Sequence, residues 1–553
     1  MSANENNENR QARAAAHWAD ECARKVIREK GAPGKEFFTC ASGITPSGTV
    51  HVGNFRETIS VDLVVRALRD LGKKARFIFS WDDYDVFRKL PKNMPRQDML
   101  EKHMHYPINM IPDPYGVEES YARHNEVEVE SRLPDLGIFP EFIYQAERYR
   151  SSMYAEGMRR ALGKRAELKE ILDKFRDEDH KIQGEWWPVS IFCGACNLDD
   201  TEIARWDGQW GLSYKCVSCG HEETVDLRSS KGAKLLWRVD WPMRWEYEKV
   251  DFEPAGKDHH SQGGSFDTAR LVCKEVYGWD APVTFRYDFI GIKGAVGKIS
   301  SSSGIVVTLD DLLNVYTPDI VRYLFAGTRP NSEFTISFDL DVIKIYEDFD
   351  RTERVAWGME SAKDEAVAAL EKRVYVLSQP ASLEDGRSIP FESLQRPHQV
   401  PFRHMCNLVQ IADGDVEKAL AGLAALPGGP TAAQIPALRA RARRAKYWAE
   451  NCAPEEFRFK LKRAGDSPAE LSPAELGAVR LLRDEVVARL DELADEKACA
   501  QAIYDVARKA GIESKDLFRA AYTALVGKSQ GPRLASLLRT VDKDRLLGIL
   551  GAY

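Results

Sequence analysis

The chain has 553 residues, of which 44 % are hydrophobic and 29 % are charged, a composition that excludes global disorder. One hydrophobic core does not organise this length, so about three or four domains are expected. The net charge of −7 excludes nonspecific nucleic-acid binding over the whole surface but leaves room for a local basic face. Without a signal-peptide core or a membrane-length apolar window, we expect a cytoplasmic protein with no membrane contact.

A strand, a loop and a helix open the predicted fold. Residues 11–30 have the pattern of an amphipathic surface helix. Glu36–Ser42 is a short apolar run, and Arg56–Leu71 has helical periodicity after a loop rich in glycine and proline. Lys74–Ser80 predicts a second buried strand. Strand, helix and strand at this spacing are typical of a Rossmann-like αβ domain.

The middle of the chain predicts an insertion, after which the sheet continues. Residues 91–140 are rich in proline and loops, and Ser152–His180 is strongly helical. In Gly184–Ala233, aromatic residues and cysteines replace the helical pattern. Strand-like character then resumes in Leu235–Pro242 and in Val283–Ile292.

The last third of the chain, beyond Ser337, predicts a helical domain with a basic face. Residues 431–465 contain nine basic and three acidic residues, in a protein of net negative charge. Aromatic side chains interleave with that charge and could stack on unpaired bases beside phosphate partners. The alternative is a solvated helix face with buried aromatics beneath it. The aromatic residues concerned are Tyr447, Trp448, Phe457 and Phe459.

The loop at residues 45–54, TPSGTVHVGN, predicts a phosphate site. Gly48 and Gly53 allow a ligand to approach the backbone where the next helix begins, and helix N-termini favour phosphate. His51 and Asn54, three residues apart on the first turn, would project in the same direction and donate hydrogen bonds to phosphate oxygens. The alternative interpretation is a turn followed by an ordinary helix cap.

A second loop, GKISSSSG at residues 297–304, combines one lysine with four hydroxyl groups between glycines. A lysine beside hydroxyls can clamp a leaving pyrophosphate. We interpret Lys298, Ser300 and Ser301 as candidate catalytic residues. Taken alone, the loop is also compatible with a flexible linker.

Four cysteines give the strongest local signal. Cys193 and Cys196 are separated by 19 residues from a second pair, Cys216 and Cys219, which is the spacing of a zinc ribbon. Two hairpin turns would supply four thiolates to one tetrahedral ion with no position left for a substrate. The spacing therefore predicts a structural zinc ion. Two disulfides are the less favoured alternative.

These motifs resemble those of the class I aminoacyl-tRNA synthetases, and within that class the lysyl-tRNA synthetase family. HVGN resembles the HIGH signature with asparagine in place of the last histidine, and KISSS resembles the KMSKS loop with Ser301 in place of the second lysine. Roughly 240 residues separate the two motifs, as in that class. The strings TPSGxxHxGNxRE, RVDWPMRW, GKDHH and TPDIVRYLFAGTRPN extend the resemblance over nearly the whole chain.

The resemblance implies residues for each substrate. Those expected at ATP are Pro46, Ser47, Gly48, His51, Gly53, Asn54 and Lys298. Those expected at lysine are Gly43, Thr45, Asp82, Trp237, His259, His260 and Tyr287, and the sequence does not separate the two histidines. Asp82 follows a predicted strand at the end where open αβ sheets bind ligands.

The resemblance also implies a domain order, with an α/β, Rossmann-like catalytic domain and an all-α anticodon-binding domain. The expected segments are an N-terminal helical extension (1–35), the catalytic domain (36–100 and 235–305), a connective insertion (101–234) with a zinc ribbon (190–222), a stem-contact region (306–385) and the anticodon-binding domain (386–553).

The implied function is ATP-dependent ligation of L-lysine to tRNA(Lys) through a lysyl-adenylate, by a monomer that uses Mg²⁺ with ATP and a structural Zn²⁺. Three alternatives remain open at this point. They are another class I synthetase such as a glutamyl-like enzyme, a small nucleotidyltransferase that does not use tRNA, and a noncatalytic RNA-binding paralogue in which Asn54 and Ser301 mark lost chemistry.

Overall fold

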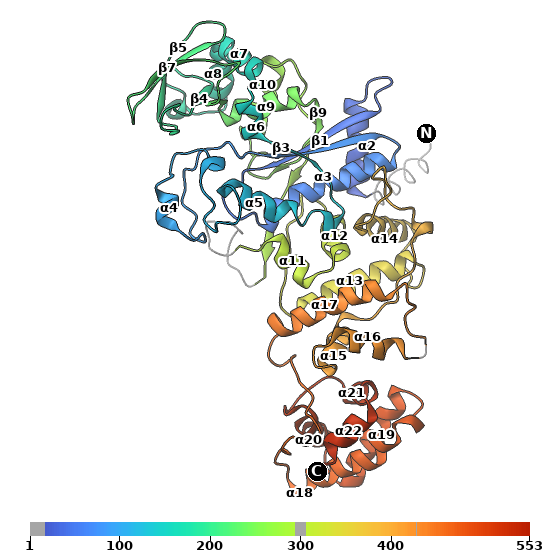
Figure 1. The fold of residues 1–553 in the computed structure, drawn as a ribbon. Helices are drawn as coiled ribbons and strands as arrows, with labels where there is room; N and C mark the ends of the chain where they lie inside the picture. The colour runs from blue at the N-terminus through green and yellow to red at the C-terminus, as the bar shows by residue number, and fades with distance from the viewer. Residues whose placement is uncertain (1–16, 294–305, 427) are drawn as a thin grey trace. The chain divides into compact units, whose positions relative to one another are not determined.

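A computed structural model of the chain describes residues 17–293, 306–426 and 428–553 (Figure 1). Internal contacts divide the chain into two units. The first comprises residues 1–313, 318–336 and 352–394, and the second comprises residues 314–317, 337–351 and 395–553. In the described residues, no helix is both long enough and apolar enough to span a bilayer.

A parallel four-stranded sheet lies at the centre of the first unit. Its order is β3-β2-β1-β9, and β1 pairs with β2 from Phe37 opposite Lys74 to Ile44 opposite Trp81. Because helices cover both faces, β1 and β2 read as apolar runs without strict alternation. The order reverses at β1, and ligands bind outside the carboxyl ends of strands at such a point. The strands are β1 (Phe37–Ile44), β2 (Lys74–Trp81), β3 (Glu141–Tyr144) and β9 (Val250–Phe252).

Helices cover the two faces of this sheet. On one face α3 (Val52–Asp70) contacts β1 and β2, and α2 (Trp18–Lys30) lies beside α3 (Figure 1). On the other face α9 (Trp237–Tyr247) and α10 (Ser265–Glu275) bury aromatic rings against small and branched side chains of the strands. That core consists chiefly of Trp241, Trp245, Phe266, Ala41, Ile78 and Ile143.

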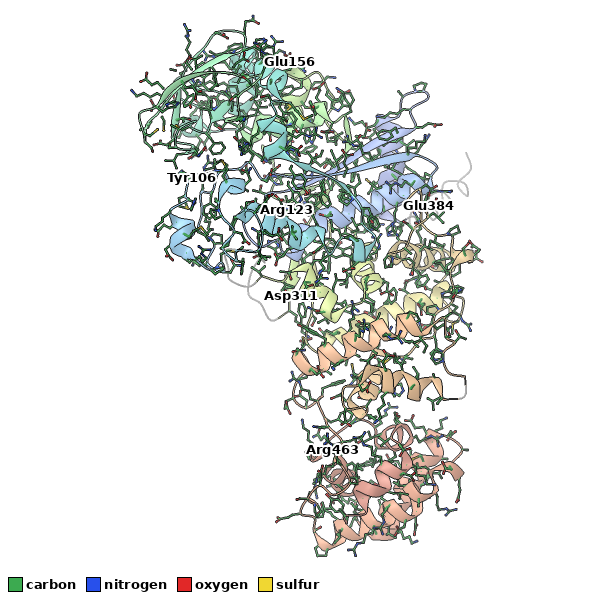
Figure 2. The ribbon with its side chains drawn as sticks, viewed as in Figure 1. Tyr106, Arg123, Glu156, Asp311, Glu384 and Arg463 are labelled. Carbon is green, nitrogen blue, oxygen red and sulfur yellow. The ribbon has the colours of Figure 1, made fainter. Side chains whose placement is uncertain are left out.

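The segment between β2 and β9 contains short helices and a small antiparallel sheet of order β5-β6-β7. The side chains of this segment include Arg123 of α5, labelled in Figure 2. Its helices are α4 (Gln97–Glu101), α5 (Tyr121–Glu130), α6 (Gln145–Arg150), α7 (Ala155–Gly163) and α8 (Arg165–Asp173). Its strands are β4 (Val189–Ile191), β5 (Thr201–Trp206), β6 (Gly211–Cys216), β7 (Glu222–Asp226) and β8 (Ala233–Leu235).

The strand predicted over residues 235–242 is wrong. Only Leu235 belongs to a strand, β8, and residues 237–247 form α9. Trp237, Trp241 and Trp245 recur every four residues, which is a helical spacing, and their rings contact one another in sequence along α9. The sheet also takes β3 from residues 101–234, where the sequence predicts only an insertion, because a four-residue strand carries too little periodicity to be recognised.

The rest of the first unit follows α10 and adds short paired strands and helices. β10 (Ala255–Gly256) pairs with β11 (Arg286–Tyr287), and β12 (Ile290–Ile292) pairs with β13 (Phe334–Ile336). The helices are α11 (Leu309–Val315), which runs into the second unit, α12 (Pro318–Ala326) and α14 (Glu365–Ser378).

The second unit is helical in its described residues, as the sequence predicts. α13 (Asp341–Ala356) begins in this unit and ends in the first. Trp448 is buried at its core and donates a hydrogen bond to the Phe338 carbonyl at 2.9 Å. The other helices are α15 (Phe402–Ile411), α16 (Val416–Ala424), α17 (Ile435–Asn451), α18 (Pro473–Leu481), α19 (Glu496–Ala510), α20 (Ser514–Val526), α21 (Leu534–Thr540) and α22 (Lys543–Leu550).

One buried carboxylate joins α3 to α12 in the first unit. The Asp62 carboxylate forms an ion pair with the Arg322 guanidinium at 2.8 Å and lies 3.7 Å from the Arg66 guanidinium. Both guanidinium groups are almost completely buried. Arg322 also donates to the backbone carbonyls of Leu136 and Leu377, so this network ties three segments to the helix behind the sheet.

We predict that Asp62→Ala lowers the free energy of unfolding of the first unit by about 3–5 kcal/mol, because two buried guanidinium groups lose their counter-ion. Urea denaturation measures the effect. The matched control is Asp135→Ala, which removes an exposed ion pair to Arg132 and should cost less than about 1 kcal/mol. Equal losses in the two variants would contradict the role assigned to Asp62.

Candidate active site and candidate metal centre

An acidic cavity lies at the carboxyl ends of β1 and β2, where the sheet order predicts a ligand site. It encloses about 90 Å³ and is lined by residues of β1, α3, β2, α9 and the segment after β9. Its lining includes three acidic side chains, those of Glu57, Asp82 and Glu253, and one guanidinium group, that of Arg244. A fourth carboxylate, Glu248, forms ion pairs with two arginines that do not line the cavity. The excess of carboxylates suits a cationic ligand.

Glu57 of α3 is held by hydrogen bonds from two other segments. The Gly43 N–H donates to its Oε1 at 3.0 Å, and the Tyr287 hydroxyl donates to its Oε2 at 2.6 Å. Burial raises the pKa of the Glu57 carboxyl to about 8, and the nearby Glu253 adds to the rise. Gly43 and Tyr287, both predicted at the lysine site, therefore meet at a carboxylate that the sequence analysis did not assign.

Asp82 lies where it is predicted, at the carboxyl end of β2, but it is already paired. Arg244 of α9 donates to its Oδ1 at 2.6 Å and approaches Asp240 at 3.1 Å. Burial raises the pKa of Asp82, while the Arg244 charge opposes the rise. Because Asp82 and Arg244 neutralise each other, Asp82 shapes the cavity more than it adds charge to it.

Glu253 directly follows β9 and takes hydrogen bonds from two indoles. Trp241 donates to its Oε1 at 3.0 Å, and Trp245 donates to its Oε2. Burial raises the pKa of the Glu253 carboxyl. The indoles hold the carboxylate in a fixed position at the cavity wall without neutralising it.

The structure separates the two neighbouring histidines. His259 lines the acidic cavity, and its ring lies 5.5 Å from that of Trp237, which also lines the cavity. His260 is not among the lining residues. Its ring stacks on Phe266 at 4.8 Å, and its Nε2 lies 3.2 Å from the Thr284 hydroxyl. Among the two candidates, His259 is therefore placed at the cavity and His260 in the packing around it.

His51 and Asn54 form a reciprocal cap at the start of α3. His51 Nδ1 accepts from the Gly53 N–H at 3.1 Å, and Asn54 Oδ1 accepts from the His51 N–H at 3.3 Å. A neutral imidazole that accepts at Nδ1 carries its proton on Nε2, and an amide that accepts at Oδ1 keeps its N–H donors for another partner. Gly53 is required because a Cβ there would lie 2.9 Å from the His51 ring.

The loop before this helix is anchored by its backbone. The Ser47 carbonyl accepts from the Tyr121 hydroxyl at 2.8 Å, and the Pro46 carbonyl accepts from the Asn125 amide at 3.4 Å. The Thr45 hydroxyl lies 3.4 Å from Asp85, so the structure places it at a side chain outside the acidic cavity. Gly48 is buried within the same loop.

The predicted serine loop, with Lys298, Ser300 and Ser301, lies outside the described residues. The chain that follows it is described and returns to the candidate ATP site. Specifically, the Val307 carbonyl accepts a hydrogen bond from the Val52 N–H at 2.9 Å, at the first residue of α3.

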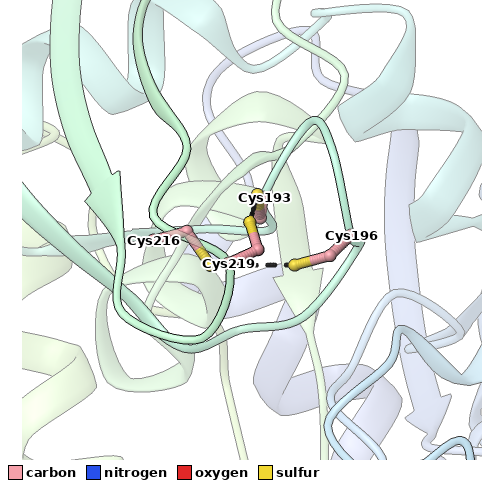
Figure 3. A group of neighbouring side chains, drawn as sticks. All are labelled: Cys193, Cys196, Cys216 and Cys219. Carbon is pink, nitrogen blue, oxygen red and sulfur yellow. Dashed lines mark hydrogen bonds between the residues drawn. The ribbon is translucent and has the colours of Figure 1, made fainter.

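The four predicted cysteines converge from two loops (Figure 3). Their sulfur atoms all lie within 4.8 Å of one another, with Cys193 Sγ 3.6 Å from Cys219 Sγ and Cys196 Sγ 3.7 Å from Cys216 Sγ. These separations exceed the roughly 2.05 Å of a disulfide. The cluster could hold a metal ion, whereas disulfide pairing is not seen among the described cysteines.

Three residues of the cavity, Glu57, Glu253 and Arg244, are not among those predicted from the sequence. Glu57 is the last letter of the string TPSGxxHxGNxRE and lies in a helix whose neighbouring side chains are mostly buried, so an acidic residue at this point of the motif is a usable signal. Glu253 follows a three-residue strand and has no local pattern of its own. Arg244 could be recognised only through its partner Asp82, which is 162 residues away in sequence.

The aromatic residues predicted on the basic face are mostly packed in the second unit. Trp448 and Phe459 are buried, and Phe457 packs edge-on against Trp448. Tyr447 is exposed, and it is the one of the four that offers a surface ring. Among the basic residues of this face, Arg441 forms a bidentate ion pair with the Asp350 carboxylate.

Comparison with known proteins agrees with the resemblance predicted from sequence. The family described as tRNA synthetases class I (K) matches residues 16–381. A lysine–tRNA ligase from Treponema pallidum (strain Nichols) is 52 % identical over 538 residues, covering 97 % of this chain and 98 % of that protein. A lysine–tRNA ligase from Borreliella burgdorferi is 47 % identical, covering 97 % of this chain and 99 % of that protein.

The similarity extends beyond these bacteria. A lysine–tRNA ligase from Thermococcus kodakarensis is 42 % identical over 536 residues, covering 96 % of this chain and 98 % of that protein. The family match covers the sheet, the acidic cavity and the cysteine cluster, and the relatives are similar over nearly their whole length. The chain therefore belongs to the family of tRNA synthetases class I (K).

Proposed function

We propose that the chain is an ATP-dependent ligase that joins L-lysine to tRNA(Lys) through a lysyl-adenylate. The observation that carries this proposal is the buried acidic cavity beside the N-terminus of α3. Relatives that are similar over nearly the full length are lysine–tRNA ligases. A glutamyl-like enzyme is disfavoured because Arg244, the one guanidinium that lines the cavity, is already paired with Asp82 and leaves no cation for the side chain of glutamate.

Lysine occupies the acidic cavity in this proposal. Its ammonium group offers three donors and one positive charge, which Glu57 and Glu253 can accept. Its aliphatic stem packs on the indole of Trp237, whose ring lies against those of Trp241 and His259. When lysine binds, the Glu57 carboxyl loses its proton. The positive charge of the lysine ammonium group then balances the negative charge of the Glu57 carboxylate.

ATP lies with its phosphates at the start of α3. The helix N-terminus favours negative charge, and the His51 imidazole and the Asn54 amide lie at its cap and on its first turn. Because Asn54 retains N–H donors, its replacement of histidine does not signal lost chemistry. Lys298, Ser300 and Ser301 are proposed to hold the departing pyrophosphate. Mg²⁺ that enters with ATP would neutralise further phosphate charge.

The reaction needs positioning and charge stabilisation more than acid–base chemistry. The lysine carboxylate oxygen attacks the α-phosphorus in line, an oxygen–phosphorus bond forms, and pyrophosphate leaves with the electron pair of the bond that breaks. The terminal ribose hydroxyl of tRNA then attacks the activated carbonyl, and AMP leaves. Both steps gain from holding the reactants together and from fixed donors at the developing negative charge.

The cysteine cluster is proposed to hold a structural zinc ion. Four thiolates at Zn–S distances of about 2.3 Å in a tetrahedron lie roughly 3.8 Å apart, and the observed 3.6 and 3.7 Å fit that geometry. With four protein ligands, no coordination position remains for a substrate. The ion would hold together the loop between β4 and β5, which carries Cys193 and Cys196, and the turn from the end of β6 to β7, which carries Cys216 and Cys219.

We also propose the domain roles expected from the sequence. The sheet and its helices carry the chemistry. Residues 101–234, except β3, which belongs to the sheet, form the connective insertion with a zinc ribbon at 190–222. Residues 306–385 contact the tRNA stem, and residues 386–553 bind the anticodon. The enzyme is proposed to act as a monomer in the cytoplasm. Tyr447, the exposed ring among the basic helices, is the candidate for stacking on an anticodon base.

We predict that the wild-type protein charges tRNA(Lys) with lysine and that Lys298→Ala lowers kcat roughly 100-fold, because one transition-state cation is lost. Steady-state aminoacylation measures this. Lys274→Ala removes an exposed lysine of α10 paired with Asp280 and serves as the control with unchanged kcat. Full activity of Lys298→Ala would refute the role of the serine loop, and no charging by wild type would refute the function.

Lysine affinity is predicted to increase with pH. Since the pKa of Glu57 is about 8 in the free protein, lysine must displace a proton below that pH. The association constant should rise by up to about tenfold per pH unit between pH 6.5 and 8, with proton release. Isothermal titration calorimetry in buffers of different ionisation enthalpy measures the association constant and the number of protons released. In Glu57→Gln the association constant should no longer depend on pH in this range. The control Glu29→Gln, on the exposed surface of α2, should keep the wild-type dependence. A wild-type association constant that does not change with pH would contradict the assignment.

Metal analysis by plasma mass spectrometry should find about one zinc ion per chain in the wild-type protein. Cys216→Ser should lose most of it because one of four thiolates is removed. Cys22→Ser, a cysteine of α2 outside the cluster, is the matched control and should retain the metal. Zinc retained by Cys216→Ser, or a different metal in wild type, would contradict the proposed site.

A further inference from the structure

The loop that precedes α3 is held by two side chains of a helix that is distant in sequence. Tyr121 and Asn125 lie about one helical turn apart on α5, and both are buried. The Tyr121 hydroxyl donates to the Ser47 carbonyl at 2.8 Å, and the Asn125 amide donates to the Pro46 carbonyl at 3.4 Å. Two successive carbonyl groups of the loop therefore point toward α5.

These contacts fix the direction of two peptide groups. The described peptide bonds are all trans, and in a trans peptide group the carbonyl and the N–H that follows it point in opposite directions. Because the carbonyls of Pro46 and Ser47 face α5, the N–H groups of Ser47 and Gly48 face away from it. Successive N–H groups directed to one side of a loop form a site that favours an anion.

A glycine makes the second of these peptide groups easy to turn over. Gly48 has no Cβ that would restrict its backbone angles, and type I and type II turns differ by such a rotation of their central peptide group. After the rotation, the Ser47 carbonyl oxygen would face the side to which the Gly48 N–H now points. An oxygen with partial negative charge would then replace a donor where a phosphate is expected, so the loop needs an anchor that selects one orientation.

The Tyr121 hydroxyl is a rigidly held donor. Its ring belongs to a small apolar core and packs edge-on against Phe87, with 5.4 Å between the ring centres. The Tyr121 N–H donates to the Ile111 carbonyl at 2.8 Å, which fixes the start of α5. Burial raises the pKa of the Tyr121 hydroxyl, so the group keeps its proton and remains a donor at neutral pH. The anchor therefore has one position and one protonation state.

We propose that Tyr121 is a positioning residue for ATP, because its hydroxyl holds the peptide group between Ser47 and Gly48 with the N–H toward the triphosphate. Asn125 holds the preceding peptide group in the same way. The inference rests on the proposed function, in which the phosphates lie at the start of α3. It adds that a helix of the connective insertion shapes the nucleotide site through the backbone of the loop, without a side chain of its own that touches the nucleotide.

The test compares ATP with adenosine, which lacks the phosphates, and Mg²⁺ is present in both cases. Their dissociation constants are measured by isothermal titration calorimetry without lysine or tRNA, so that no reaction occurs. Tyr121→Phe keeps the buried ring and removes the donor. The affinity for ATP should fall roughly 3- to 10-fold, as expected for one lost hydrogen bond, while the affinity for adenosine should change by less than about 1.5-fold.

Tyr346→Phe on α13 is the matched control. The Tyr346 side chain is also buried, and its hydroxyl donates at 2.9 Å to the Val315 carbonyl, which is not part of the loop. This variant loses the same kind of hydrogen bond and should keep the wild-type affinity for both ligands. In ATP–pyrophosphate exchange, Tyr121→Phe should raise the KM for ATP by the factor found for binding and leave the KM for lysine unchanged. A general loss of structure would raise both KM values.

Asn125→Ala is a second variant, at the other anchor, and it should also weaken the binding of ATP more than that of adenosine. Equal losses of affinity for ATP and adenosine in Tyr121→Phe, or an ATP affinity equal to that of wild type, would overturn the assignment. So would a wild-type protein that binds adenosine as tightly as ATP, because the phosphates would then contribute nothing. Failure of the proposed function is distinguishable, because it appears as absent lysine-dependent exchange while the comparison of ATP and adenosine still reports on the loop.

Discussion

The half-buried carboxyl group of Glu57 is the interaction on which the site depends. It lies in α3, it is fixed by the Gly43 N–H of β1 and by the Tyr287 hydroxyl of β11, and it faces the cavity next to Glu253. An ionised carboxylate without a cation is costly in such surroundings, which is why its pKa rises to about 8. In the free protein the Glu57 carboxyl therefore holds a proton below about pH 8, and in the proposed function the ammonium group of lysine takes the place of that proton.

The same helix, α3, also carries the residues that are proposed to bind the phosphates of ATP. Its first turn carries the His51 and Asn54 cap, and the next residues after Phe55 are Arg56 and Glu57. Arg56 is buried and donates to the backbone of two segments that flank the site, through the carbonyls of Asp288, Phe289, Arg329, Pro330 and Ser332. Less than two helical turns therefore connect the proposed phosphate donors, the scaffold contacts of Arg56 and the Glu57 carboxyl that is proposed to bind lysine.

Much of this could be predicted from sequence because the signals are local. Strands β1 and β2, helix α3, the cap residues and the cysteine cluster each have a pattern within about 25 residues. Long-range pairings were not predictable in this way. Arg244 neutralises Asp82 from 162 residues away, and α9 was mistaken for a strand because its tryptophan spacing was overlooked beside its apolar run. His259 and His260 are adjacent in sequence, and only three-dimensional packing separates them.

The most direct test of the central claim, that a buried excess of carboxylates selects a cationic amino acid, is the amino-acid dependence of ATP–pyrophosphate exchange in the presence of total tRNA. All twenty amino acids are compared on the same preparation. The account predicts exchange with lysine and none above background with glutamate, glutamine or any other uncharged or acidic amino acid. Exchange driven by an acidic amino acid, or by none, would contradict it.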